Sequence, residues 1–235
     1  MIMTSTLSYI RACAWGGPAF LVLLIVFWGL MGNNVPPFGS DVPAETVAGY
    51  LADHAVQVRI GMIFTAAAGP LYLVWGVAIS AVMERIDPDE PILPRLQIWG
   101  AGFTTLVITI PACIWATAAF RPDRLAPETT LMLYDLGWML FDLQWSLTTL
   151  QMLAMAICVL KDRRDIPIVP RWVGWFVAWV GCMLPMLALI SLFKSGPFGR
   201  NGLINYWFEF PVFFLFMIVV SVFLFRALAR LQRDG

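Results

Sequence analysis

The sequence predicts an all-α integral membrane protein, a bundle of about six transmembrane helices. Of its 235 residues, 60% are hydrophobic and only 13% are charged, whereas soluble domains carry about 25% charged residues. The apolar residues also form runs long enough to cross a bilayer, which takes about 20 residues in a helix. Because these runs are continuous and lack the alternation of barrel strands, helices are expected.

Six segments meet this length criterion. They are residues 13–32, 60–83, 97–119, 131–160, 172–193 and 206–229. The first is too long for the apolar region of a cleaved signal peptide and is expected to be the first span. A second domain has no room beside six spans, so residues 1–235 are expected to form a single transmembrane domain. Kinks are expected at the prolines inside four spans, which are Pro70, Pro111, Pro185 and Pro211.

The distribution of Lys and Arg predicts the orientation. With an even number of spans both termini lie on one side, and that side holds ten of the 15 Lys and Arg residues while the other holds five. The positive-inside rule therefore predicts that both termini are cytoplasmic. The expected location is the cell membrane, as a multi-pass protein with membrane lipids as partners.

The longest loop, residues 33–59, is expected on the outer side. Its sequence predicts a short helix at about 43–57. Ser40 or Asp41 is a candidate N-cap, and Glu45 favours the positive end of that helix. The helix is expected either to lie across the outer mouth of the bundle or to run into the second span. His54, on this helix, is expected to be exposed.

Composition and motifs exclude several classes of function. A formal net charge of zero argues against nucleic acid as a partner. One histidine and four scattered cysteines without a C-x-x-C predict no metal site and no cofactor. The sequence lacks the phosphate-binding motif G-x-x-x-x-G-K, the zinc-protease motif H-E-x-x-H and the hydrolase motif G-x-S-x-G. A bound quinone or lipid is left open.

The fourth predicted span carries two carboxylates. Ionisable groups at membrane depth cost about 2.5–3.5 kcal/mol each on insertion scales, so they mark functional sites by default. Asp135 and Asp142 are seven residues apart and share a helix face. Trp138 and Trp145 each follow an aspartate by three residues, which predicts one polar and aromatic stripe towards the bundle interior. The alternative is that Asp142 hydrogen-bonds a neighbouring helix and fixes packing.

Other charges lie at the outer ends of spans, namely Arg59, Arg121, Lys194 and Glu209. We expect them to surround an outward-opening pocket in which the cations hold a polar or anionic head and Asp142 lies deeper. The candidate lining residues are Trp115, Tyr134, Trp138 and Trp145. Such aromatic faces suit sterol-like, terpenoid or aromatic ligands and stabilise cationic intermediates. The alternative is snorkelling side chains and interfacial ion pairs.

Several strings resemble a family of bacterial six-span integral membrane proteins with no assigned activity. They are Arg59-Ile60-Gly61-Met62, Phe120-Arg121-Pro122, Pro170-Arg171-Trp172-Val173-Gly174, Gly196-Pro197-Phe198 and Asn201-Gly202-Leu203. This resemblance implies a shared six-helix fold over nearly the whole chain. The chain is also loosely similar to the transmembrane terpene cyclases in size, helix count and membrane carboxylates. No motif aligns, however, and no catalytic residue is carried over.

Three functions remain open. The first is an intramembrane site for a small lipophilic or amphipathic molecule in a cofactor-free isomerase, cyclase or lyase, with Asp142 as general acid and Asp135 or Glu209 as its partner. The second is a small transporter for an organic anion, with Asp142 as proton carrier. The third is a non-catalytic subunit of a membrane complex, and an oligomer or partner subunit is compatible with all three.

Overall fold

The computed structural model describes the backbone of residues 2–234 and the side chains of residues 7–233, and this part of the chain is helical without strands. It contains six helical segments long and apolar enough to cross a membrane. They are Leu7–Met31, Ala55–Ile86, Ile92–Ala118, Pro127–Lys161, Arg171–Ser191 and Leu203–Arg233. Each includes most of one predicted segment, so the predicted helical class and the number of spans are confirmed.

Several spans consist of more than one helical element. The first contains α1 (Ile2–Ala14), α2 (Gly16–Leu23) and the π-helix η1 (Leu24–Met31). The second and third are the continuous helices α4 (Ala55–Ile86) and α5 (Ile92–Ala118), which retain their prolines inside the helix. The fourth is α6 (Pro127–Asp142) and α7 (Trp145–Lys161). The fifth is α8 (Arg171–Met183) with the 3₁₀ segment η3 (Leu184–Ser191), and the sixth is the π-helix η4 (Leu203–Phe208) with α9 (Glu209–Asp234).

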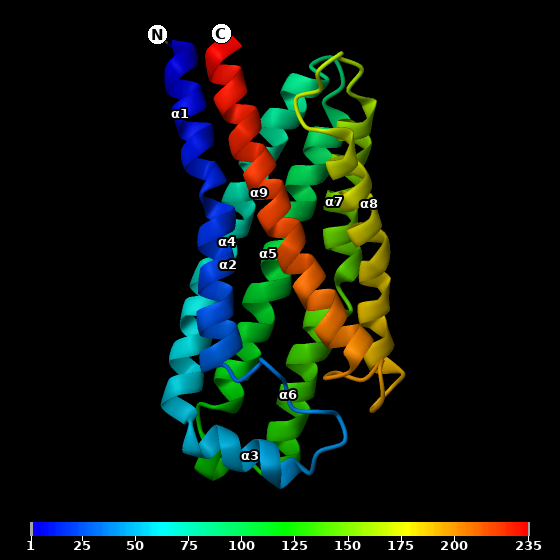
Figure 1. Cartoon of the computed structure of the whole chain (residues 1–235). Helices are drawn as coiled ribbons and strands as arrows, with labels where there is room; N and C mark the ends of the chain where they lie inside the picture. The colour runs from blue at the N-terminus through cyan, green and yellow to red at the C-terminus, as the bar shows by residue number, and fades with distance from the viewer. Residues whose placement is uncertain (1, 235) are drawn as a thin grey trace.

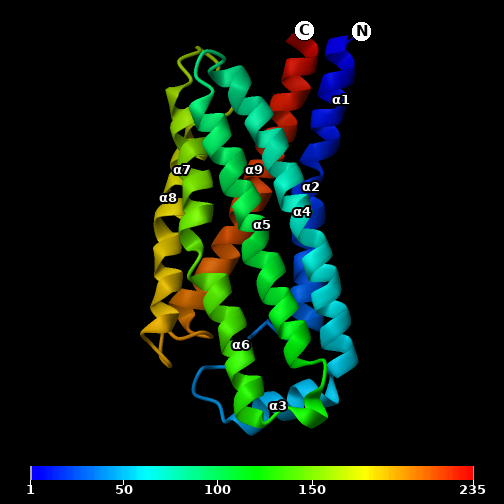
Figure 2. The ribbon, with the colours of Figure 1, turned by 180° about the vertical axis from the view of Figure 1, so that it is seen from behind.

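Both termini lie at the same end of the bundle, and α3 (Ala44–Asp53) lies across the opposite end (Figure 1). α9 crosses the front of the bundle diagonally, while α5 lies between α4 and α7 when the bundle is seen from behind (Figure 2). The predicted short helix therefore exists and covers the mouth of the bundle. Its predicted side-chain cap is wrong, because Pro43 is the N-cap and no side chain caps the helix.

The end that carries the termini is closed by apolar packing. Side chains of α4, α7, α9 and the loop after α7 meet there around a void of only about 10 Å³, at the limit of what one water needs. The void is lined by Ile79, Val82, Met83, Ile86, Met155, Val159, Val169, Val220, Phe223 and Leu224. Arg164 closes the adjacent surface, because it pairs with Asp162 at 2.9 Å and donates to the carbonyl oxygens of Arg85 and Ile86 at the end of α4.

Close packing of α2 on α4 depends on Gly16. A Cβ at this position would lie 2.6 Å from the carbonyl oxygen of Leu71 and 3.0 Å from the amide nitrogen of Trp75. Because both atoms belong to the backbone of α4, Gly16→Ala is expected to separate the helices and to lower the thermal stability of the purified protein, by about 1–3 kcal/mol. A Cβ added at Gly49 in α3 would meet nothing within 4 Å, so Gly49→Ala is the control. It is expected to stabilise the protein by up to about 1 kcal/mol through helix propensity.

Candidate functional site

The turn between η3 and η4 brings Arg200 into the protein. Gly196 has a φ of +77°, and a Cβ at Gly202 would lie 2.4 Å from the carbonyl oxygens of Gly196 and Pro197. The Pro197 carbonyl accepts the amide hydrogens of Ile204 and Asn205 at 2.9 and 3.2 Å. This compact turn folds over the end of the bundle, and Arg200 is consequently only 1% exposed.

Arg200 makes three kinds of contact around its guanidinium. One terminal nitrogen donates to the carboxylate of Asp135 in a salt bridge. The other donates to the carbonyl oxygen of Phe38 at 3.4 Å, and the charge lies 5.1 Å from the ring centre of Tyr134. The Asp135 side chain is 40% exposed. The salt bridge therefore joins a buried cation to a carboxylate that still reaches solvent.

The loop between η1 and α3 forms hydrogen bonds with residues of three spans. The amide of Phe38 donates to the hydroxyl of Tyr134 at 3.2 Å, and the hydroxyl of Tyr206 donates to the carbonyl oxygen of Asn34. The amide group of Asn34 in turn donates to the carbonyl of Trp28 at 3.0 Å. Together with α3, this loop covers the end of the bundle where the sequence predicts an open mouth.

Below this cover lies a cluster of aromatic rings. Trp28, Phe141 and Phe210 are nearly parallel, with ring centres 5.4–5.9 Å apart and interplanar angles of 7–14°. Trp138 packs obliquely against all three. Trp115 contacts Trp138 at 5.5 Å between ring centres. The rings form a rigid aromatic layer across spans one, three, four and six.

Two carboxyl groups adjoin this layer. Asp142 follows Phe141 at the end of α6, and Glu209 precedes Phe210 at the start of α9. They are 0% and 3% exposed, and none of their four oxygens has a hydrogen-bond partner among the described residues. The two groups lie close enough for their charges to interact, and Arg200 lies close enough to act on Asp142. Within the described part of the chain, they are the only buried carboxyl groups whose oxygens all lack a partner.

A cavity of about 60 Å³ lies between five of the six spans, next to Glu209. It is several times larger than the roughly 10–15 Å³ that one water requires. Its lining consists of Leu24, Thr104, Val107, Ile108, Phe141, Trp145, Thr148, Leu184, Leu187, Glu209, Phe210, Phe213 and Phe214. Glu209 is the only ionisable residue of this lining, and the Thr104 and Thr148 hydroxyls are hydrogen-bonded to each other at 3.0 Å.

The cavity coincides with irregular helix geometry. The helices α6 and α7 are separated at Leu143 and Gln144, and the side-chain amide of Gln144 donates to the carbonyl of Leu140 at 2.9 Å. This bond satisfies a carbonyl near the end of α6. The π-helix η1 and the 3₁₀ segment η3 also contribute lining residues, and η4 ends immediately before Glu209. Irregular backbone at membrane depth is tolerated where it lies in protein or lines a cavity, and here both conditions apply.

Three further buried polar side chains lie between the cavity and the end of the bundle that carries the termini. Tyr72, Gln97 and Gln151 are at most 1% exposed, and each has at least one polar atom without a partner among the described residues. The helices α5 and α7 pack closely beside Gln151, since a Cβ at Gly100 would lie 2.8 Å from the Cβ of Gln151. The apolar layer that closes the end with the termini lies beyond them.

The predicted site residues of the fourth and sixth spans lie near each other, in different roles. Glu209 and Trp145 line the cavity, whereas Asp142 is buried without reaching its lining. Trp115, Tyr134 and Trp138 belong to the packed layer and are not among the lining residues. Asp135 pairs with Arg200 at the covered end. The expected single stripe is interrupted because the helix breaks between Asp142 and Trp145.

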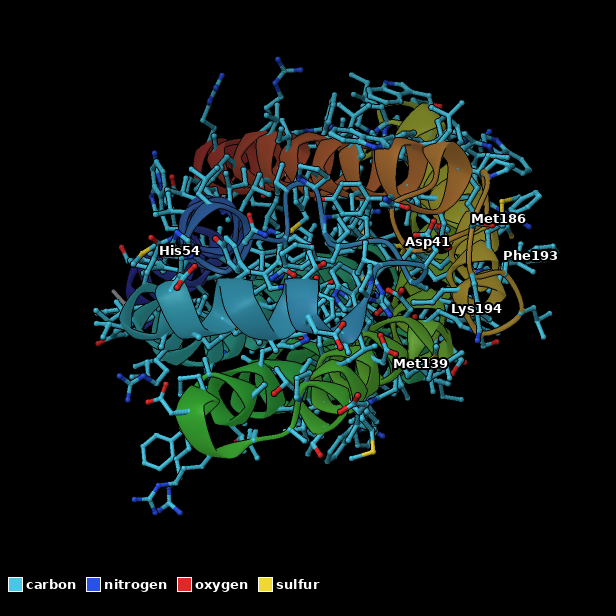
Figure 3. All side chains as sticks on the ribbon, turned by 90° about the horizontal axis from the view of Figure 1, so that it is seen from below. Asp41, His54, Met139, Met186, Phe193 and Lys194 are labelled. Carbon is cyan, nitrogen blue, oxygen red and sulfur yellow. The ribbon has the colours of Figure 1, made fainter. Side chains whose placement is uncertain are left out.

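The three predicted outer cations do not converge on this cavity. Arg59 and Arg121 lie beside the ring of Phe120 on the surface between α4 and α5. Lys194 is exposed at the rim of the bundle, on the side away from His54, which precedes α4 (Figure 3). His54 is half-buried and stacks on Tyr50 with ring centres 4.2 Å apart.

Sequence reasoning missed Arg200, the two threonines and the phenylalanines of the lining. Arg200 stands in the turn sequence Gly-Pro-Phe-Gly-Arg-Asn-Gly, and its three glycines were a signal that the loop folds tightly. Thr104 and Thr148 were detectable as polar residues in apolar spans. Phe141 and Phe210 had no distinguishing signal beyond their position next to a carboxylate.

Among the side chains of residues 7–233, no three His, Cys, Asp or Glu residues gather in a way that could hold a metal ion. Comparison of the chain with protein-family models, curated proteins and solved structures gave no match. Neither resemblance noted from the sequence strings gains support from these comparisons, and the function is argued from the site alone.

Proposed function

We propose that this integral membrane protein binds a small lipophilic molecule in the cavity beside Glu209 and transfers a proton to it. The observation that carries the proposal is a lining of apolar and aromatic side chains with a single carboxyl group, which has no hydrogen-bond partner in the described part of the chain. Ligand sites have this composition, since apolar walls supply affinity and a few polar groups fix orientation. The ten Lys and Arg residues at the end that carries the termini support a cytoplasmic position for both termini.

The ligand enters sideways from the lipid. The loop 33–43 and α3 cover one end of the bundle, and apolar packing closes the other. The partly exposed lining residues are Trp145, Leu187, Phe213 and Phe214, all within spans. They are the side chains that move when a molecule larger than the present cavity enters.

The chemistry is that of a cofactor-free isomerase, cyclase or lyase. A carboxylic acid is far less costly to bury than an unpaired carboxylate, so at least one of the two buried groups Asp142 and Glu209 carries a proton. Glu209 lines the cavity and donates its proton to the ligand. Asp142 is the partner that keeps this proton on Glu209, since two neighbouring carboxylates repel each other. The rings of Phe141, Phe210 and Trp145 then stabilise positive charge on the protonated molecule. The Glu209 carboxylate takes a proton from a neighbouring carbon of this cation, which forms the product and restores the acid.

A transporter is the second candidate, and the helix break at Leu143–Gln144 favours it because discontinuous helices mark many transporter sites. An organic anion is a poor cargo for a lining whose only ionisable group is a carboxyl. The void nearest the termini is lined by apolar side chains only. The subunit hypothesis explains neither the cavity nor the two unpartnered carboxyls.

The test is to fill the cavity entrance. Leu187→Trp is expected to abolish the lipophilic compound that is extracted by organic solvent from the purified wild-type protein and identified by mass spectrometry. The matched control is Met186→Trp, since Met186 is 41% exposed and does not line the cavity. Retention of the same compound in Leu187→Trp at the wild-type ratio would contradict the proposed site.

A further inference from the structure

A second site lies on the membrane-facing surface between α4 and α5. A groove of about 500 Å³ is lined there by Val56, Arg59, Ile60, Ile63, Ala116, Thr117 and Phe120. None of these residues lines the cavity beside Glu209. α4 starts at Ala55 and α5 ends at Ala118, so the groove begins where two spans meet the bilayer surface.

Arg59 lines the end of this groove nearest the bilayer surface, and Arg121 directly follows Phe120, another residue of the lining. The guanidinium carbons of Arg59 and Arg121 lie 5.9 and 5.3 Å from the ring centre of Phe120. The Nε of Arg59 donates to the carbonyl of Ala55 at 3.2 Å, which leaves its terminal nitrogens for another partner. Among the described residues neither arginine forms a salt bridge, although the chain has as many acidic as basic residues. Two neighbouring cations without a carboxylate favour an anion between them.

The rest of the groove is apolar and descends into the membrane. Ile63 lies one helical turn deeper than Arg59 on α4, and Ala116 lies in the last turn of α5, before Phe120, which follows the helix. Val56 and Ile63 are each 62% exposed. A molecule that fits this surface carries its negative charge at the bilayer surface and a hydrocarbon chain below it.

We propose that the groove binds one anionic diacyl phospholipid, with the phosphate between Arg59 and Arg121 and an acyl chain along Ile60 and Ile63. Arginine suits this role because its planar donors match phosphate oxygens. Basic pockets between transmembrane helices recognise anionic headgroups in the same way. The site is independent of the proposed catalytic cavity, and either can fail without the other.

The test measures binding of phosphatidylglycerol to the detergent-purified full-length protein by native mass spectrometry, with phosphatidylcholine of the same chains for comparison. Each arginine near a membrane surface contributes a factor of about five to anionic lipid affinity. The variant Arg59→Gln with Arg121→Gln is therefore expected to bind phosphatidylglycerol about 25-fold more weakly than wild type. Lys194→Gln removes an exposed charge elsewhere on the rim and is expected to change affinity less than twofold.

Three results would overturn the proposal. Equal binding of phosphatidylcholine and phosphatidylglycerol by wild type would show that the arginines do not select charge. Equal losses in Lys194→Gln and the double variant would show a diffuse electrostatic effect. Displacement of phosphatidylglycerol by an equal concentration of inorganic phosphate would show that the groove takes a free anion without a chain. Unchanged melting temperatures of all variants establish that the differences reflect binding.

Discussion

Asp135→Asn is expected to be among the most destabilising single substitutions in the chain. Its carboxylate is the only acidic group paired with the buried Arg200 in the described structure, and asparagine leaves that cation without a counter-charge. Removing one partner of a buried ion pair costs about 3–5 kcal/mol, which for a domain of this size corresponds to a fall in melting temperature of about 6–20 °C. Thermal unfolding of the purified protein, followed by tryptophan fluorescence, measures the effect.

The two partners are expected to respond unequally. Arg200→Met removes the buried charge and leaves Asp135, whose side chain is 40% exposed and therefore remains hydrated. This variant is expected to lose less stability than Asp135→Asn, and the double variant to be no less stable than Arg200→Met alone. Asp123→Asn changes an exposed aspartate at the same end of the bundle and controls for loss of charge. If Asp135→Asn unfolded at the same temperature as this control, Arg200 would not depend on Asp135.

The spans were predictable because the bilayer imposes a simple physical rule. A helix satisfies all backbone hydrogen bonds internally, so any sufficiently long apolar run in a membrane adopts it. The observed elements extend beyond several predicted ones, as at Ala55 and Pro127, because helices continue past the hydrocarbon region into loops. Hydropathy alone does not detect these extensions, since the additional turns contain polar residues.

The site was predictable only in part. Asp142 and Glu209 stood out because carboxyl groups are rare at membrane depth, and the structure places them within electrostatic range of each other. The sequence has no proline or glycine at the helix break at Leu143–Gln144. The seven-residue spacing of the aspartates and tryptophans therefore predicted one continuous helix face. Arg200 lies in a loop between two spans, and only the folded turn shows which way its side chain lies.

Glu209→Gln is expected to separate function from stability. Glutamine keeps the size of the side chain and removes its acidic proton, and loss of a general acid lowers turnover by about 10²–10⁴-fold. The measurement is conversion of the compound that copurifies with wild type, added back to the variant in lipid nanodiscs. Because neither oxygen of Glu209 has a hydrogen-bond partner among the described residues, the melting temperature is expected to stay equal or to rise.

Asp142→Asn distinguishes the two carboxyl groups. Asp142 lies outside the cavity lining, so its loss is expected to reduce turnover while the ligand still binds, whereas Glu209→Gln reduces both. Glu128→Gln, at an exposed position in the first turn of α6, is the control for a neutralised carboxyl group. If the Glu209→Gln protein melted several degrees lower and still turned over the compound, the carboxyl group would have a structural role in helix packing and no catalytic role. In that case the cavity beside it would bind its ligand without acid chemistry.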